Sequence, residues 1–164
     1  MKESVIVLNW YGPYDSECLN ENDETRVIYL ATGRTKYQRN DQIQYCGITE
    51  RRAAVRKKGH KKLCLITNNR KFWVAKIVHP RRATRSDLEA AESVIVYLWQ
   101  PPLNVRKTAH PPRNKYIVVS HWFYTDGRPR QRKQKMLREL YDVMCWDGEF
   151  WRTSNLRRWS NWLD

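Results

Sequence analysis

Five side chains able to act on a phosphate ester follow one another along the middle of the chain: Tyr29, Tyr45, Arg56, His60 and Glu92. Hydrolysis of a phosphodiester needs a metal ion that polarises the phosphate, an aligned water, a cation for the transition-state charge and a proton acceptor. Glu92 offers the hard oxygen that Mg²⁺ or Mn²⁺ takes. The planar guanidinium of Arg56 matches a phosphate. These residue types could together serve the hydrolysis of a phosphodiester.

Three strands are expected around the tyrosines, from runs of β-branched and aromatic residues at 26–31, 43–48 and 72–79. Tyr29 and Tyr45 fall on the first two of these strands, which a polar connection joins. Side chains on paired strands can converge on one face of a sheet. The two phenol groups are therefore expected to lie near each other.

Two helices are expected to carry the charged members of the set. The first, N-capped by Thr49, places His60 one turn after Arg56 on the same face. The second begins at a capping box over 86–89 and carries Glu92. A proline pair ends it. Nearby residues leave alternatives open, since Arg52 competes with Arg56, and Glu89 competes with Glu92.

This order of motifs resembles that of the GIY-YIG nuclease family. Val27-Ile28-Tyr29 and Tyr45-Cys46-Gly47 correspond to the two motifs of the family name, although Val27 stands in place of a glycine. Glu92 precedes a Pro-Pro-Leu-Asn segment that ends at Asn104, as the family's glutamate precedes a similar segment. The resemblance implies an α+β fold, a small three-stranded antiparallel sheet flanked by helices, over about residues 26–104.

The resemblance also implies a one-metal mechanism in which a tyrosine takes the proton of the attacking water. A tyrosine with an ordinary pKa of about 10 is a poor base near pH 7 unless a cation lowers that pKa. Glu92 is the implied ligand of Mg²⁺ or Mn²⁺, and Asn104 is expected to be more structural than chemical. The implied catalytic residues are Tyr29, Tyr45, Arg56, His60, Glu92 and Asn104.

The composition favours a polyanionic partner. The chain has 164 residues, a formal net charge of +14 and a pI near 9.9. Such an excess is typical of proteins that bind nucleic acid, and double-stranded DNA is the expected partner. Basic side chains give sequence-independent phosphate contacts, and those expected to do so are Arg51, Arg52, Lys57, Lys58, Lys61, Lys62, Arg128, Arg130, Arg132, Lys133 and Lys135.

Three regions are expected along the chain. Residues 1–25 form an acidic N-terminal strand and loop, residues 26–104 the nuclease core, and residues 105–164 a basic, Trp-rich, β-containing extension packed on the core. The four cysteines fall at no zinc-binding spacing and are expected to be free. No apolar run has the length of a membrane helix or the pattern of a signal peptide, so a cytoplasmic protein without membrane contact is expected.

Two other classes of function remain open from the sequence. One is a nucleic-acid-binding module that uses the basic face without turnover. The other is a basic interaction protein that binds an acidic partner. The choice of DNA or RNA, the sequence specificity and the oligomeric state also remain open.

Overall fold

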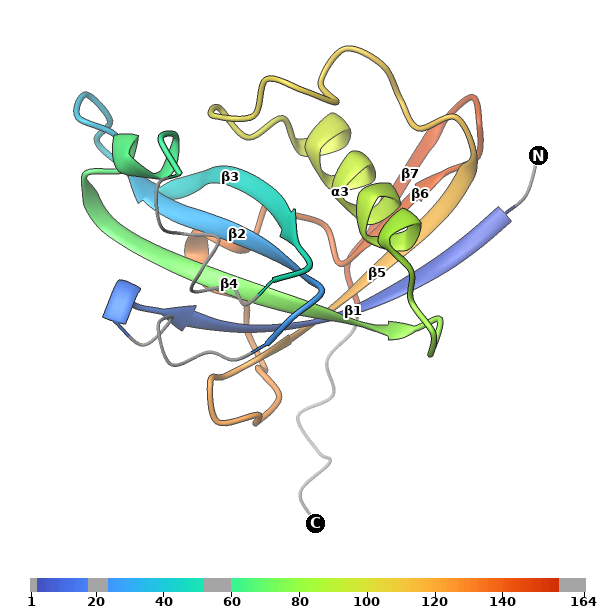
Figure 1. Ribbon diagram of the computed structural model, residues 1–164, viewed down its shortest axis with the longest axis horizontal. Coiled ribbons are helices and arrows are strands. Elements are labelled where there is room, and N and C mark those ends of the chain that lie inside the picture. Colours follow the sequence, from blue (N-terminus) through green and yellow to red (C-terminus); the bar gives the residue numbers. More distant parts are fainter. Residues whose placement is uncertain (1–2, 18–23, 52–59, 157–164) are drawn as a thin grey trace.

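A computed structural model describes residues 3–17, 24–51 and 60–156 of the chain. Seven strands form one mixed sheet in the order β3-β2-β4-β1-β5-β6-β7 (Figure 1). The strands are β1 (Glu3–Tyr14), β2 (Val27–Arg34), β3 (Gln42–Thr49), β4 (Asn68–His79), β5 (Lys115–Phe123), β6 (Val143–Trp146) and β7 (Trp151–Ser154). Neighbouring strands are antiparallel, except that β1 and β5 are parallel.

The central strand β1 joins the two halves of the sheet. Its alternate residues Ile6, Leu8 and Trp10 are fully buried, as expected for a strand with one face on the core. The indole of Trp10 stacks on that of Trp122 in β5, with ring centroids 5.5 Å apart. Trp10 Nε1 also donates a hydrogen bond to Ser120 Oγ at 3.0 Å. The parallel β1–β5 pair is thus fixed by packing as well as by backbone pairing.

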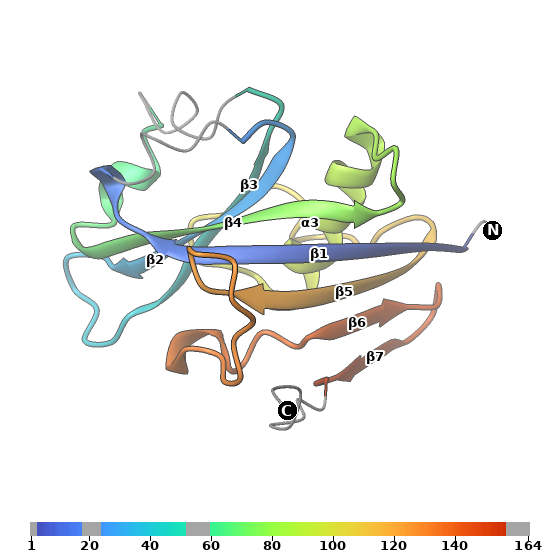
Figure 2. The ribbon, with the colours of Figure 1, turned by 90° about the horizontal axis from the view of Figure 1, so that it is seen from below.

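The sheet curls, and one helix, α3 (Arg85–Trp99), packs against the face that carries Trp10 (Figures 1 and 2). Leu88, Val94 and Ile95 of α3 enter this core. On the other face, a short 3₁₀ helix, η1 (Leu63–Leu65), covers the half of the sheet formed by β2, β3 and β4. The candidate catalytic strands are therefore covered on both faces.

The predicted second helix is confirmed, but its predicted start is wrong. Thr84 is the N-cap, and its side chain and that of Asp87 form the reciprocal capping bonds expected over 86–89. The spacing that the motif requires occurs twice, at Thr84–Asp87 and at Ser86–Glu89, and the helix forms its capping bonds at the first. Glu89 is thereby released from capping, and its carboxylate accepts a hydrogen bond from Arg85 Nε at 2.8 Å.

The expected fold, a three-stranded antiparallel sheet flanked by helices, is wrong. The three predicted strands are present as β3, β2 and β4, but β4 is not an edge. An edge there would leave the outer N–H and C=O groups of β4 unpaired, and β1 pairs with them. The sheet then continues through β5, β6 and β7, so its seven strands include parts of the segments 1–25 and 105–164.

The expected β-containing extension includes a hairpin. It is formed by β6 and β7 around Asp147-Gly148, and a short 3₁₀ helix, η2 (Lys135–Leu137), precedes it. Cys46, Cys64 and Cys145 are free, and Cys46 is the buried one of these three. Within the described residues, no helix has the length and apolar character needed to cross a membrane. The helix expected over 49–59 falls mostly outside the described residues.

Candidate active site

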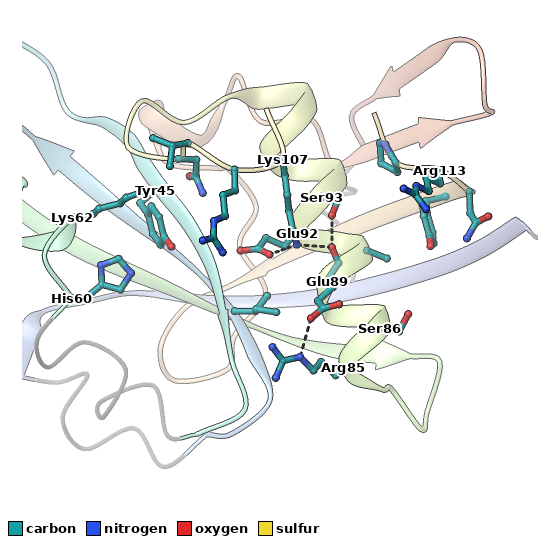
Figure 3. A pocket seen from close by; sticks show the side chains of 18 of the residues that line it. Tyr45, His60, Lys62, Arg85, Ser86, Glu89, Glu92, Ser93, Lys107 and Arg113 are labelled. Carbon is teal, nitrogen blue, oxygen red and sulfur yellow. Dashed lines mark hydrogen bonds and ion pairs between the residues drawn. The ribbon is translucent and has the colours of Figure 1, made fainter. Parts of the chain in front are cut away.

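A cavity of about 1000 Å³ lies along the outer edge of β3, between that strand and α3. Four of the expected catalytic residues line it: Tyr45, His60, Glu92 and Asn104. Figure 3 shows Tyr45 and His60 on one side of this space and Glu92 on the other, where α3 projects it. The remaining walls come from residues 104–116, which return from α3 to the sheet.

The two tyrosines and the histidine form one aromatic cluster. The rings of Tyr29 and Tyr45 have centroids 6.0 Å apart, and His60 meets Tyr45 edge to face at 4.9 Å. Tyr29 is 5% exposed and does not line the cavity. The tyrosine at the cavity is therefore Tyr45, with Tyr29 packed behind it.

Gly47 makes room for this cluster. It pairs with Tyr29 across β2 and β3, and a Cβ atom at position 47 would lie 2.7 Å from the Tyr29 hydroxyl. The same Cβ would lie 2.8 Å from the Tyr45 ring. Only glycine lets both rings pack across this point of the strand. The glycine at the end of the Tyr45-Cys46-Gly47 motif is thus explained by the space that the two tyrosine rings need.

Asn104 fastens the segment after α3 to the edge of β3. Its Oδ1 accepts the Cys46 N–H at 2.9 Å, and its Nδ2 donates to the Cys46 carbonyl at 2.8 Å. The Leu103 N–H donates to the Gln44 carbonyl at 2.9 Å. Because both polar atoms of the Asn104 side chain bind backbone, this residue positions the cavity wall.

Glu92 presents its carboxylate at the cavity and pairs with Lys107 (Figure 3). The Lys107 ammonium also donates to the Glu89 carbonyl at 3.2 Å. Burial raises the pKa of the Cys46 thiol, and the nearby charge of Glu92 raises it further. Lys107 was missed by the sequence analysis, because its segment has no clear helix or strand pattern and its position depends on the contact of Asn104 with β3.

The competing carboxylate, Glu89, is held at the rim of the cavity. Hydrogen bonding from Arg85 lowers the pKa of Glu89. Arg85 also donates to Glu50, at 2.7 Å, and these two partners raise the pKa of Arg85. Arg85 thus ties the end of β3 to the first turn of α3. Of the two candidate carboxylates, Glu92 is the one on the inner wall.

Cations outnumber carboxylates around the cavity. The lining side chains with positive charge are Lys61, Lys62, Arg85, Arg106, Lys107 and Arg113, and only Glu89 and Glu92 are negative. Lys61, Arg106 and Arg113 are exposed and make no ion pair with any residue that the structure describes. Lys62 lies over the Tyr45 ring, with Nζ 5.8 Å from the centroid. Such a surface attracts anions.

Other predicted phosphate contacts have different surroundings. Arg52, Arg56, Lys57 and Lys58 lie outside the described residues, and Arg51 is exposed. The segment 128–135 follows β5 and ends at the start of η2, and none of its residues lines the cavity (Figures 1 and 2).

Two of the five cations of the segment 128–135 make contacts in the interior of the fold. Arg130 donates to the Gly12 carbonyl at 2.8 Å and stacks over Tyr124 at 4.0 Å, and Lys133 forms an ion pair with Asp142. Arg128 pairs with Asp126 on the surface, whereas Arg132 and Lys135 are exposed.

No cluster of metal ligands is complete in the described part of the chain. Among residues 3–17, 24–51 and 60–156, no three His, Cys, Asp or Glu side chains gather where they could hold a metal ion. A metal at this cavity would depend on Glu92, on water and on oxygens of a bound phosphate. Comparison with protein-family models, with curated proteins and with solved structures finds no match to this chain.

Proposed function

We propose that this chain is a metal-dependent endonuclease of the GIY-YIG kind that hydrolyses phosphodiester bonds of DNA. One observation carries the proposal: Tyr45, His60 and Glu92, which lie far apart in the sequence, line one cavity whose other charges are mostly positive. A proton acceptor, a carboxylate and an anion-binding surface are the components that phosphodiester hydrolysis needs.

Glu92 is the residue that would hold Mg²⁺ or Mn²⁺. Its carboxylate lines the cavity and already binds one cation, the Lys107 ammonium. A single carboxylate suits Mg²⁺, which keeps several waters and takes oxygens from its phosphate substrate. When bound, the ion supplies a Lewis acid that polarises the phosphate and lowers the pKa of a bound water.

The chain's own residues supply the rest of the reaction. The attacking water forms a bond from its oxygen to phosphorus and gives up a proton, which Tyr45 in its phenolate form accepts. The bond from phosphorus to the leaving oxygen breaks, and His60 in its protonated form gives that oxygen a proton. Arg56, by its family resemblance, and Lys107, by its position, stabilise the charge on the phosphate.

A second function is favoured by one feature of the same site. Because Lys107 pairs with Glu92, the cavity also suits a nucleic-acid-binding module in which this ion pair is permanent and no metal binds. A basic interaction protein, the third class, would bind no nucleic acid even at low salt.

Nicking of supercoiled plasmid with Mg²⁺ or Mn²⁺ tests the proposal. We expect the wild type to cut and Glu92→Gln to lose activity by at least about a hundredfold, with DNA binding in EDTA retained. Glu139→Gln is the matched control, because Glu139 is exposed and does not line the cavity. Equal cutting by wild type and Glu92→Gln would overturn the role of Glu92. Salt-sensitive binding without cutting by either protein would support the binding module instead.

A further inference from the structure

A second basic cavity lies next to the candidate active site. It has a volume of about 710 Å³ and is lined by residues from the ends of β2, β3 and β4 and from the start of α3. Its basic residues are Arg26, Lys76, Arg81, Arg82 and Arg85, and its acid is Glu50. None of Arg26, Arg81 and Arg82 belongs to the expected phosphate contacts of the sequence analysis.

Arg85 is common to both cavities and forms the wall between them. Its guanidinium pairs with Glu50 and Glu89, at 2.7 and 2.8 Å. These two carboxylates balance the charge of Arg85, so Arg85 is not the strongest site for an anion. Cations that have no carboxylate partner among the described residues lie in the cavities on either side of Arg85.

Arg26, Arg81 and Arg82 are the cations available in the second cavity. All three are exposed and form no ion pair with a described residue. Lys76 differs from them, because it pairs with Glu24. The three arginines come from two segments, just before β2 and just after β4, which the antiparallel pairing of these strands brings together. The fold, and not a local run of basic sequence, creates this cluster.

We propose that Arg26, Arg81 and Arg82 form a second phosphate-binding site, which holds duplex DNA on the flank of the scissile position. The proposal rests on the proposed function, because it takes DNA as the ligand of the first cavity. Two adjacent cationic cavities with a neutralised wall between them suit a ligand that carries many phosphates, whereas a small anion needs only one. A duplex presents phosphates at regular spacing along both strands, so one duplex can contact both cavities.

A membrane surface fits this cluster less well than DNA does. Peripheral membrane sites combine basic residues with exposed apolar side chains that enter the lipid. The second cavity offers only Ile77 as a large apolar lining residue, and Ile77 packs partly against the core. The charge pattern of the cluster is therefore that of a phosphate-backbone contact.

Equilibrium binding of labelled duplexes in EDTA, followed by fluorescence anisotropy at several salt concentrations, tests the proposal. We expect Arg81→Ala combined with Arg82→Ala to weaken binding and to lower the slope of log affinity against log salt by about 2. The change should be present with a long duplex and absent with one too short to reach both cavities. The matched control is Arg39→Ala combined with Arg138→Ala, since both arginines are exposed and line neither cavity.

A charge-preserving variant and a vesicle assay complete the design. Arg81→Lys combined with Arg82→Lys should keep the wild-type slope, and the thermal midpoints of both double variants should match that of the wild type. An unchanged slope in the alanine variant overturns the proposal, as does a loss of binding to anionic vesicles without any loss of binding to DNA.

The outcome is separable from that of the plasmid assay. Binding in EDTA requires no turnover, so a protein that cuts no DNA can still show the slope change. A protein that cuts DNA with an unchanged slope in the alanine variant keeps the proposed function and loses only the second site.

Discussion

Two lysine–carboxylate pairs of this molecule have similar chemistry and different surroundings. Lys133 and Asp142 lie 3.1 Å apart, with side chains that are only 9% and 2% exposed. Asp142 also accepts hydrogen bonds from Trp122 Nε1 and from the Leu156 N–H, both at 2.9 Å. Lys107 and Glu92 pair on the wall of a cavity, with side chains that are 32% and 13% exposed.

The difference between the pairs separates structure from function. Breaking a buried ion pair, such as Lys133–Asp142, leaves one buried charge without its partner, which is strongly unfavourable. A pair that faces a cavity can exchange partners, because water or a ligand can solvate each member after separation. The surroundings of Lys133–Asp142 are those of a pair that stabilises the C-terminal half of the sheet, whereas Lys107–Glu92 is open to ligands of the cavity.

The largest expected effect comes from breaking the buried Lys133–Asp142 pair. Asp142→Ala should lower the free energy of unfolding by about 3–5 kcal/mol, because it removes the carboxylate that balances the charge of the buried Lys133 ammonium. Urea denaturation followed by tryptophan fluorescence measures the change. The control is Asp126→Ala, which removes an exposed partner of Arg128 and should leave the unfolding midpoint unchanged. Equal midpoints for the two variants would contradict the structural role of Asp142.

Breaking the Lys107–Glu92 pair should affect cleavage much more than stability. Lys107→Met should change the free energy of unfolding by less than about 1 kcal/mol, but lower the cleavage rate by at least about tenfold, because it removes a cation from the phosphate site. The Mg²⁺ concentration needed for half-maximal cleavage should fall, since the ammonium no longer competes for Glu92. Magnesium titrations of plasmid nicking measure both effects.

A lysine of matched exposure provides the control for this variant. Lys71 is 33% exposed, pairs with Asp15 and lines neither cavity. Lys71→Met should leave cleavage and its magnesium dependence unchanged. An unchanged magnesium dependence in Lys107→Met would mean that Lys107 and the metal do not share Glu92.

Local pattern was sufficient to predict β2, β3, β4 and α3. The strands are rich in β-branched and aromatic residues, the apolar residues of the helix repeat at its period, and a proline or a cap marks several ends. The central place of β1 was not predictable in this way. Trp10 stacks on Trp122, more than a hundred positions along the chain, and no local periodicity records a pairing over that separation. The parallel β1–β5 pairing extends the sheet to seven strands and makes it mixed, and for this reason the expected fold class was wrong.

The same limit applies to the site. Tyr45, His60 and Glu92 were proposed from residue type and order, and the structure brings these three residues to one cavity. Lys107 lies in a segment without such a signal, and only the Asn104 contact with β3 fixes its position. For Lys133 the sequence pattern favoured an exposed side chain, whereas the structure buries it. A run of basic residues predicts a solvated surface, and burial of one member is a property of the tertiary fold.

The smallest expected effect concerns the rest of that basic run. Arg132 and Lys135 are exposed, but neither lines either of the two cavities. If one duplex contacts both cavities, Arg132→Ala combined with Lys135→Ala should change the slope of log affinity against log salt by less than about 0.5. The same anisotropy titrations measure it. A change near 2 would place the duplex on the segment 128–135 and make this basic run, not the arginines beside α3, the main electrostatic contact.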